Sequence, residues 1–210
     1  MSDEKKLIAL TFDDGPDRVA TVSVLDTLEK YGCRASFFLI ADNISEDTED
    51  IVRRETALGH EVNNHSRTHG YMDKMSAEDI RAEIGYTDEI IIRLTGKRPV
   101  FFRPPYIAVS DRLFETVEKP FICGIGSNDW EDDVSAEQIA ESVLRQAHDG
   151  AIMLLHDAKD NSRTPEAVKT IVPALLERGY ELVTLGELFR RKGETPKRGG
   201  ILYSRVPQDK

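Results

Sequence analysis

Cysteine and long apolar runs are both scarce in this sequence. It has two cysteines in 210 residues, Cys33 and Cys123, which are too few for a disulfide framework. Both lie beside apolar segments, so we expect two buried free thiols. No run approaches the roughly 18 apolar residues that suggest a membrane span, and we therefore expect no membrane partner.

A secretory leader is not recognisable at the start of the chain. MSDEKK is not followed by the apolar stretch of roughly 7 to 15 residues and the small-residue cleavage site that such a leader needs. Two expectations follow. The protein is cytoplasmic if MSDEKK is its natural start, and secreted or extracellular if the chain is a domain of a larger secreted enzyme that has received a new Met.

Basic residues are fewer than acidic ones. The chain has 28 Lys and Arg against 38 Asp and Glu, a formal net charge of −10. This sign argues against nucleic acid and anionic membrane surfaces as partners, because both need basic patches; a neutral substrate fits better. Hydrophobic residues make up 40% and charged residues 31%, which is typical of a globular protein with one core. We expect a single domain over residues 1–210.

Short apolar runs alternate with stretches of helical periodicity. The runs are 7–12, 35–40, 60–64, 100–104, 121–126, 151–156 and 181–185, and the main helical stretches are 19–32, 76–96, 135–150 and 164–179. Ser76, Ser135 and Thr164 are the expected N-caps of the last three. Strand followed by helix about seven times predicts an α/β fold, with parallel strands in a closed or nearly closed barrel and helices outside. The Gly- and Pro-rich residues 190–210 are expected to form a C-terminal strap.

Residues suited to acid–base or metal chemistry follow five of the expected strands. They are Asp13 and Asp14, the segment His65–His69, the segment Arg103–Tyr106, Asp129 with Trp130, and His156 with Asp157. In parallel barrels the carboxyl ends of the strands meet on one face, where functional residues gather. We therefore expect these side chains to share one site.

Two of these residues have the spacing of metal ligands. His65 and His69 are four apart, so both imidazoles can point at one ion from a single turn. Two histidines with one carboxylate form a pattern for zinc or a similar divalent metal. Adjacent residues leaving a strand point in different directions, so one of Asp13 and Asp14 can bind the metal while the other faces the substrate.

Each residue also has a structural explanation when taken alone. The two histidines can be an accidental surface pair, and the two aspartates can belong to an Asx turn closed by Gly-Pro. Arg103 can form an ordinary ion pair, and Trp130 can be plain packing. His156 can be a core histidine whose hydrogen bonds are satisfied. Their joint position on one expected face is what favours a functional site.

The sequence resembles the polysaccharide deacetylase family, also called the NodB-homology or carbohydrate esterase family 4 domain. The resemblance covers roughly residues 6 to 190 and rests on five motifs in order, TFDDGP (11–16), HSRTH (65–69), FRPPY (102–106), NDW (128–130) and LLHD (154–157). It implies a distorted, often incomplete (β/α) barrel, here of (β/α)7 type. It also implies a hydrolase that removes acetyl groups from a polysaccharide or oligosaccharide, with one divalent metal ion, Zn²⁺ or Co²⁺.

The resemblance also implies a role for each matching residue. The metal ligands would be Asp14, His65 and His69. Asp13 would be the general base, oriented by Arg103, and His156 would be the general acid, held by Asp129. The backbone N–H of Tyr106 would line the oxyanion site, and Trp130 and Leu154 would wall the pocket for the acetyl methyl.

The chain departs from the family pattern at two positions. Ile107 follows Tyr106 where the motif usually has Gly, and since a β-branched residue rarely takes a positive φ, we expect this loop to differ. Gly126 stands where the family usually has another Asp, three residues before Asp129, so the chain lacks one carboxylate that would bear on the tuning of His156 and on the shape of the sugar subsite.

The substrate is left open between two kinds of acetyl group. The segment around FICGIGSNDWEDD (121–133) looks more like acetylxylan esterase domains than chitin deacetylases, so we favour O-deacetylation of acetylxylan. The alternative is N-deacetylation of chitooligosaccharides or peptidoglycan. A glycosidase with a carboxylate pair and an inactive carbohydrate-binding module are the remaining alternatives. Other domains of a larger secreted enzyme are possible partners.

Overall fold

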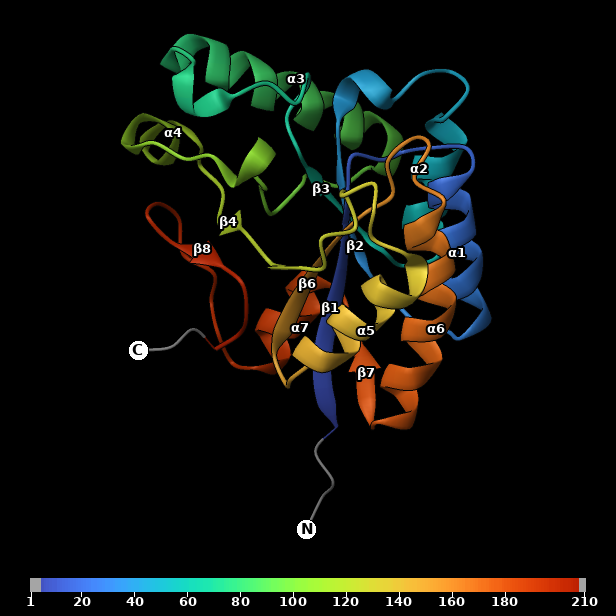
Figure 1. The fold of residues 1–210 in the computed structure, drawn as a ribbon. Coiled ribbons are helices and arrows are strands. Elements are labelled where there is room, and N and C mark those ends of the chain that lie inside the picture. The colour runs from blue at the N-terminus through green and yellow to red at the C-terminus, as the bar shows by residue number, and fades with distance from the viewer. Residues whose placement is uncertain (1–4, 208–210) are drawn as a thin grey trace.

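A parallel sheet runs through the centre of the computed structural model, which describes residues 5–207 (Figure 1). Its strands are β1 Lys6–Asp13, β2 Ser36–Leu39, β3 Glu61–Asn64, β5 Ile125–Gly126, β6 Ala151–His156 and β7 Tyr180–Leu182. The order is β3-β2-β1-β6-β5, with β7 paired to the first residues of β1. In this register Asp13 lies opposite Phe38 on one side and His156 on the other, so two of the predicted site residues end neighbouring strands.

The sheet curls into a distorted barrel. Single bridges join β3 to Phe102 and Phe102 to β4 (Phe121–Ile122), which pairs with β8 (Leu202–Tyr203). The barrel closes between β8 and β6, where the N–H of Ile152 donates to the carbonyl of Ser204 at 3.1 Å. The predicted α/β fold with parallel strands and outer helices is therefore confirmed.

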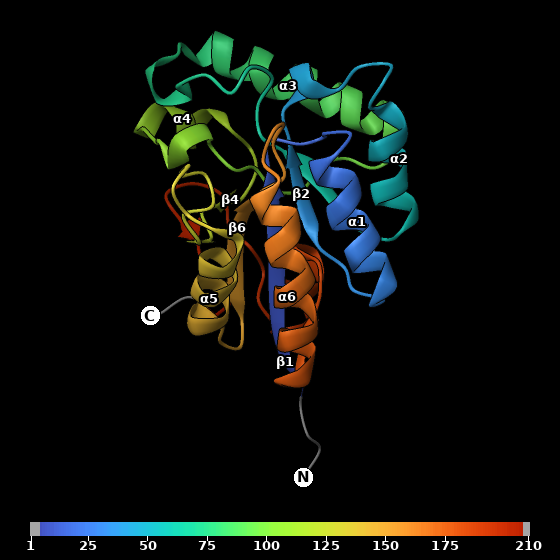
Figure 2. The ribbon, with the colours of Figure 1, turned by 45° about the vertical axis from the view of Figure 1, so that its right-hand side comes forward.

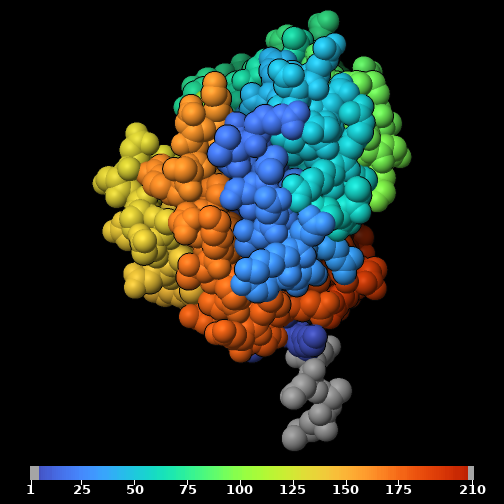
Figure 3. Space-filling model, turned by 90° about the vertical axis from the view of Figure 1, so that its right-hand side faces the viewer, coloured from blue at the N-terminus to red at the C-terminus, as the bar shows by residue number. Residues whose placement is uncertain are grey.

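Helices cover the outside of the barrel. They are α1 Ala20–Lys30, α2 Glu49–Ala57, α3 Ala77–Thr95, α4 Asp111–Thr116, α5 Ala136–Gln146, α6 Arg163–Glu177 and α7 Leu185–Arg191, with 3₁₀ turns η1 Ala41–Asn43, η2 Met72–Lys74 and η3 Pro105–Ile107. Figure 2 shows α5, α6 and α1 side by side in front of the sheet, and Figure 3 shows the orange surface of α6 directly against the blue surface of α1. Of the helices that the structure describes, none combines the length and apolar character needed to cross a membrane.

The alternation of side chains along β1 separates two cores. Ile8, Leu10 and Phe12 pack outward against the helices, whereas Leu7 and Ala9 pack into the barrel interior. All five are buried, and full burial of a side chain as large as Phe12 contributes roughly 2–3 kcal/mol. Because side chains alternate along a strand, the side chains that face the interior continue from Ala9 to Thr11. The series ends with Asp13 at the mouth of the barrel.

Several predicted elements differ in the structure. The run 100–104 contributes only the bridge at Phe102, because Pro104 and Pro105 have no N–H to donate to a ladder. The run 121–126 is split into β4 and β5 by Gly124, whose φ is 89°. In the run 181–185 the strand ends at Leu182, because α7 begins at Leu185. Part of the expected strap, 190–207, supplies β8, while residues 208–210 lie outside the described range.

The predicted caps and cysteines are largely as expected. Ser76 and Ser135 each accept a backbone N–H at the third helical position. The prediction that Thr164 is an N-cap was wrong, because α6 already begins at Arg163. Both cysteines are free thiols, but only Cys33 is buried, whereas Cys123 is partly exposed.

A substitution at Gly150 tests how closely the C-terminal segment approaches the barrel. Gly150 has a φ of 90°, and a Cβ there would lie 1.8 Å from the Val206 carbonyl oxygen. We expect Gly150→Ala to lower the free energy of unfolding by about 3 kcal/mol or more, through overpacking and a left-handed backbone. The matched control is Gly85→Ala in α3, where a Cβ meets nothing within 4 Å and should stabilise by about 0.5–1 kcal/mol. Equal stability of the two variants in urea denaturation would contradict the close approach.

Candidate active site

A cavity of about 600 Å³ opens at the carboxyl ends of the strands. Nine of the ten predicted site residues line it, namely Asp13, Asp14, His65, His69, Tyr106, Asp129, Trp130, Leu154 and His156. The tenth, Arg103, is fully buried beneath Asp13. The cavity wall also includes Ile107 and the charged residues Lys159 and Arg163, which the sequence motifs do not single out.

Asp14, His65 and His69 come together as a group that could hold a metal ion. One ligand atom from each lies within 4.8 Å of the others. The Oδ1 atom of Asp14 is 3.4 Å from Nε2 of His65 and 3.4 Å from Nε2 of His69. Asp14 and His69 both have left-handed backbones, with φ of 72° and 58°, and these turns let the two side chains converge from different loops.

The protonation states of the three side chains suit a divalent cation. Nδ1 of His65 lies 2.7 Å from the carbonyl oxygen of Arg103; since a carbonyl only accepts, Nδ1 carries the proton and Nε2 offers a lone pair. Burial raises the pKa of Asp14, but the interaction with the imidazoles of His65, His156 and His69 outweighs burial and lowers that pKa to about 2. Burial lowers the pKa of His69.

The surroundings of the Asp14 Oδ1 atom favour a bound metal ion. It is buried and has no hydrogen-bond partner among the described residues. A buried carboxylate oxygen without a partner is costly, and a cation between the two Nε2 atoms would satisfy it. Two imidazoles and one carboxylate with open positions also match the donor set of Zn²⁺ and similar ions. The residues therefore fit one divalent metal.

Asp13 is held from beneath by Arg103. Nη1 of Arg103 donates to Oδ1 of Asp13 at 2.5 Å, and Nη2 donates to the Thr11 hydroxyl at 2.8 Å. The guanidinium also lies 4.2 Å above the ring of Phe38. Asp13 Oδ2 remains on the cavity side, 3.6 Å from Nε2 of His65. The two neighbouring aspartates thus have different surroundings, one against a guanidinium and one between imidazoles.

Gly15 lets the chain pass close to Asp157 immediately after the two aspartates. A Cβ at this position would lie 2.8 Å from Oδ2 of the buried Asp157. The carbonyl of Gly15 accepts from the N–H of Ile40, and the carbonyl of Asp14 accepts from the Asn43 side chain. A glycine is therefore required to pack the TFDDGP turn against the end of β6.

His156 is held by Asp129 on the opposite wall. Nδ1 of His156 donates to Oδ1 of Asp129 at 2.9 Å, and the backbone N–H of His156 donates to Oδ2 at 2.7 Å. The Thr164 hydroxyl gives Oδ2 a further hydrogen bond at 2.6 Å; this partner was missed because the sequence suggested a helix cap there. Trp130 contacts the His156 ring edge to face, with centroids 5.6 Å apart.

The surroundings of His156 make it a cation at neutral pH. Burial lowers its pKa, but the hydrogen bond and charge of Asp129 and the charges of Asp13 and Asp14 outweigh burial and raise the pKa to about 9. The glycine at position 126 therefore does not remove the support of His156. Its main local effect concerns Trp130, since a Cβ at Gly126 would lie 3.3 Å from the indole ring.

Ile107 adopts the positive φ that is rare for a β-branched residue. Ile107 has a φ of 53°, directly after Tyr106 with a φ of 58°. The turn is closed by hydrogen bonds from the N–H of Ile107 to the Pro104 carbonyl, 3.0 Å, and from the N–H of Ala108 to the Pro105 carbonyl, 3.1 Å. These bonds hold a conformation that a β-branched residue alone disfavours, and the loop carries backbone strain.

Comparison with known proteins identifies the relatives of this chain. A model of the polysaccharide deacetylase family matches residues 1–120. The bifunctional xylanase/deacetylase of Pseudobutyrivibrio xylanivorans is 46% identical over 202 residues, which are 96% of this chain and 33% of that protein. The peptidoglycan-N-acetylglucosamine deacetylase PgdA of Listeria monocytogenes is 36% identical over 89% of this chain and 40% of its own length. The chain thus spans well under half of these curated relatives.

A solved structure matches nearly the whole chain. The family 4 acetyl xylan esterase from Clostridium thermocellum, in complex with a cobalt ion, superposes with a TM-score of 0.92. Its sequence is 44% identical, and the match covers 97% of this chain and 100% of that one.

The charge of Asp129 should control the protonation of His156. In metal-free protein we expect Asp129→Asn to lower the pKa of His156 from about 9 toward the ordinary histidine value of about 6.5, because burial is then no longer opposed by the adjacent carboxylate. Titration of the imidazole by NMR measures the shift. The exposed Asp133→Asn is the control and should leave it unchanged. A His156 that still titrates near pH 9 in the Asp129 variant would contradict this account.

Proposed function

We propose that this chain, which belongs to the polysaccharide deacetylase family, removes acetyl groups from a polysaccharide with the help of one divalent metal ion. The observation that carries the proposal is the unpartnered, buried Oδ1 of Asp14 between the Nε2 atoms of His65 and His69. Beside it the cavity holds a carboxylate and an imidazolium in distinct environments, as acid–base hydrolysis requires.

Asp14, His65 and His69 are the proposed ligands of the ion. When bound, a divalent ion there supplies Lewis acidity, which polarises an acetyl carbonyl and acidifies water. Zn²⁺ and Co²⁺ are the proposed ions, since imidazole and carboxylate donors suit both and the acetyl xylan esterase from Clostridium thermocellum was solved with cobalt.

Asp13 is the proposed general base. Arg103 occupies its Oδ1 and leaves Oδ2 to accept a proton from the attacking water. The guanidinium fixes the carboxylate, so the proton acceptor need not reorganise during the reaction. The backbone N–H of Tyr106, in the loop that lines the cavity, is the proposed donor to the developing oxyanion.

His156 is the proposed general acid. Its Nδ1 is occupied by Asp129, which leaves Nε2 to donate a proton to the leaving sugar oxygen or nitrogen. The raised pKa keeps this nitrogen protonated at neutral pH. Trp130 and Leu154, which line the same cavity, are the proposed walls around the acetyl methyl.

Acetylxylan is the proposed substrate. Support comes from the acetyl xylan esterase and the xylanase/deacetylase, which are more similar to this chain than the peptidoglycan deacetylase is. The alternative, N-deacetylation of chitooligosaccharides or peptidoglycan, rests on the 36% identity to the peptidoglycan deacetylase. The Pseudobutyrivibrio relative is a bifunctional enzyme of about three times this length, which supports a second proposal, that this chain acts as one catalytic domain of a larger secreted enzyme.

Substitution should distinguish the roles of Asp13 and Asp14. We expect Asp13→Asn to lower the rate of acetate release by about 10²- to 10⁴-fold, the usual contribution of a positioned base, while still binding one equivalent of Zn²⁺. Asp14→Asn should lose both activity and zinc, because it removes a ligand. Zinc content and acetate release measured on the same preparations test this. Loss of zinc by the Asp13 variant with retention by the Asp14 variant would reverse the assignment.

A substrate comparison tests the acetylxylan proposal. We expect zinc-loaded protein to release acetate from acetylated xylan with a higher kcat/KM than from chitooligosaccharides or peptidoglycan fragments. The zinc-loaded Asp13→Asn protein is the control for non-enzymatic loss of ester acetate. Release from N-acetylglucosamine oligomers without release from acetylated xylan would overturn the proposal in favour of N-deacetylation.

A further inference from the structure

The two proposed histidine ligands are supported in different ways. His65 donates Nδ1–H to a backbone carbonyl, which is the usual way to orient a ligand imidazole. Over the described range 5–207, the only hydrogen bond of His69 is made by its backbone N–H, which donates to Oγ of Ser66 at 3.0 Å. Its imidazole is therefore oriented by packing rather than by a hydrogen bond.

The packing is supplied by an aromatic column on the wall of the cavity. The ring of Tyr106 meets the ring of His69 at 62°, with centroids 4.6 Å apart. Tyr71 stacks on Tyr106 with centroids 4.2 Å apart and an interplanar angle of 15°. The ammonium group of Lys74 lies 4.3 Å from the centroid of the Tyr71 ring. The column thus runs from a surface cation to a proposed metal ligand.

The ring of Tyr106 needs this support because its own backbone is strained. Tyr106 and Ile107 both lie in the left-handed region, which costs free energy for residues other than Gly and persists only when the surroundings hold it. Tyr106 is also 57% exposed, so no buried core fixes its side chain. The stacked ring of Tyr71 covers one face of Tyr106, and favourable aromatic stacking opposes relaxation of the loop.

We propose that Tyr71 is a positioning residue, which holds Tyr106 against His69 and thereby fixes the imidazole of His69 for metal binding. The proposal rests on the metal site of the proposed function. Tyr71 does not line the cavity, so it acts through Tyr106 and not by contact with substrate. Its ring stacks on Tyr106, and the ammonium group of Lys74 lies over it.

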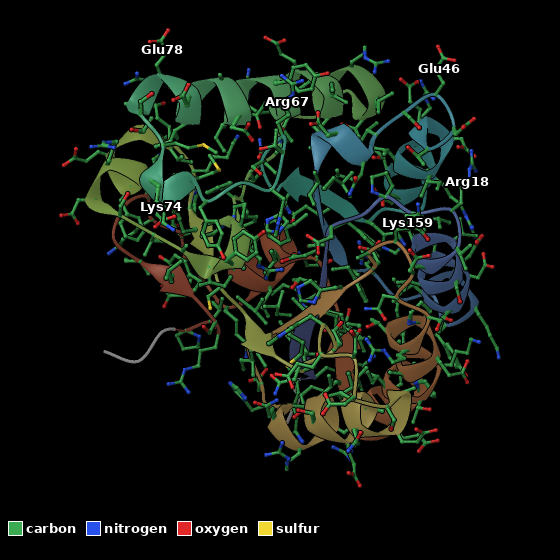
Figure 4. The ribbon with its side chains drawn as sticks, turned by 45° about the horizontal axis from the view of Figure 1, so that its top comes forward. Arg18, Glu46, Arg67, Lys74, Glu78 and Lys159 are labelled. Atoms are coloured by element: carbon green, nitrogen blue, oxygen red, sulfur yellow. The ribbon has the colours of Figure 1, made fainter. Side chains whose placement is uncertain are left out.

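Lys74 completes the column from outside. It belongs to η2, the turn that follows the HSRTH motif (65–69). Figure 4 shows Lys74 and Lys159 far apart on the face that it presents. A cation over the outer face of Tyr71 is an attractive interaction with the ring. The order Lys74, Tyr71, Tyr106, His69 means that loss of the Tyr71 ring interrupts the column at its centre.

Zinc titration of purified, metal-free protein tests the proposal. We expect Tyr71→Ala to weaken Zn²⁺ binding by about tenfold, the lower end of the range for groups that orient a metal ligand. Tyr71→Phe keeps the stacking ring and should bind Zn²⁺ as the unaltered protein does. Tyr31→Ala is the matched control, since Tyr31 is also a partly exposed tyrosine with a lysine over its ring, but lies at the end of α1. It should leave the affinity unchanged.

A crystal structure of metal-free Tyr71→Ala supplies a readout that is independent of activity. We expect the imidazole of His69 or the loop at Tyr106 to have moved, with the rest of the fold retained. Zn²⁺ affinity equal to that of the unaltered protein would overturn the role of Tyr71, and so would equal weakening in Tyr71→Phe. Failure of the proposed function is distinguishable, because it would appear as absence of acetate release by zinc-loaded unaltered protein.

Discussion

One buried cation ties the site to the barrel. Arg103 is fully buried, where an unpaired charge would cost several kcal/mol. Its guanidinium pairs with Asp13 and donates to the Thr11 hydroxyl and, at 3.4 Å, to the Ile122 carbonyl. Its own carbonyl accepts from His65. A single residue therefore fixes the proposed base, orients a proposed ligand and links β1 to β4, so the geometry of the site depends on the same contacts as the closure of the barrel.

The three histidines of the site differ because their partners differ. A carbonyl partner leaves His65 with a lone pair at Nε2, whereas the carboxylate of Asp129 favours a charged His156. His69 has neither and packs between aromatic rings. One chemical group can thus serve as ligand or acid in a single cavity, and the backbone and its neighbours decide which role it takes.

The motifs at the strand ends could be predicted because they depend on simple geometry. Parallel strands end on one face, and alternation along β1 carries Asp13 to the interior. The conformation of Ile107 could not be predicted, because turn hydrogen bonds to the carbonyls of Pro104 and Pro105 hold a backbone conformation that a β-branched residue disfavours. Thr164 resembles a helix cap in sequence, yet its hydroxyl donates to Asp129, which is 35 residues away. The aromatic column escaped prediction because Tyr71 and Tyr106 are brought together only by folding.

Asp14, His65 and His69 are proposed to hold an ion on which hydrolysis depends. The most direct measurement is acetate release from acetylated xylan by protein stripped with a chelator, before and after addition of one equivalent of Zn²⁺ or Co²⁺. We expect release to stop on stripping and to return with the metal. Undiminished release by fully stripped protein would contradict it.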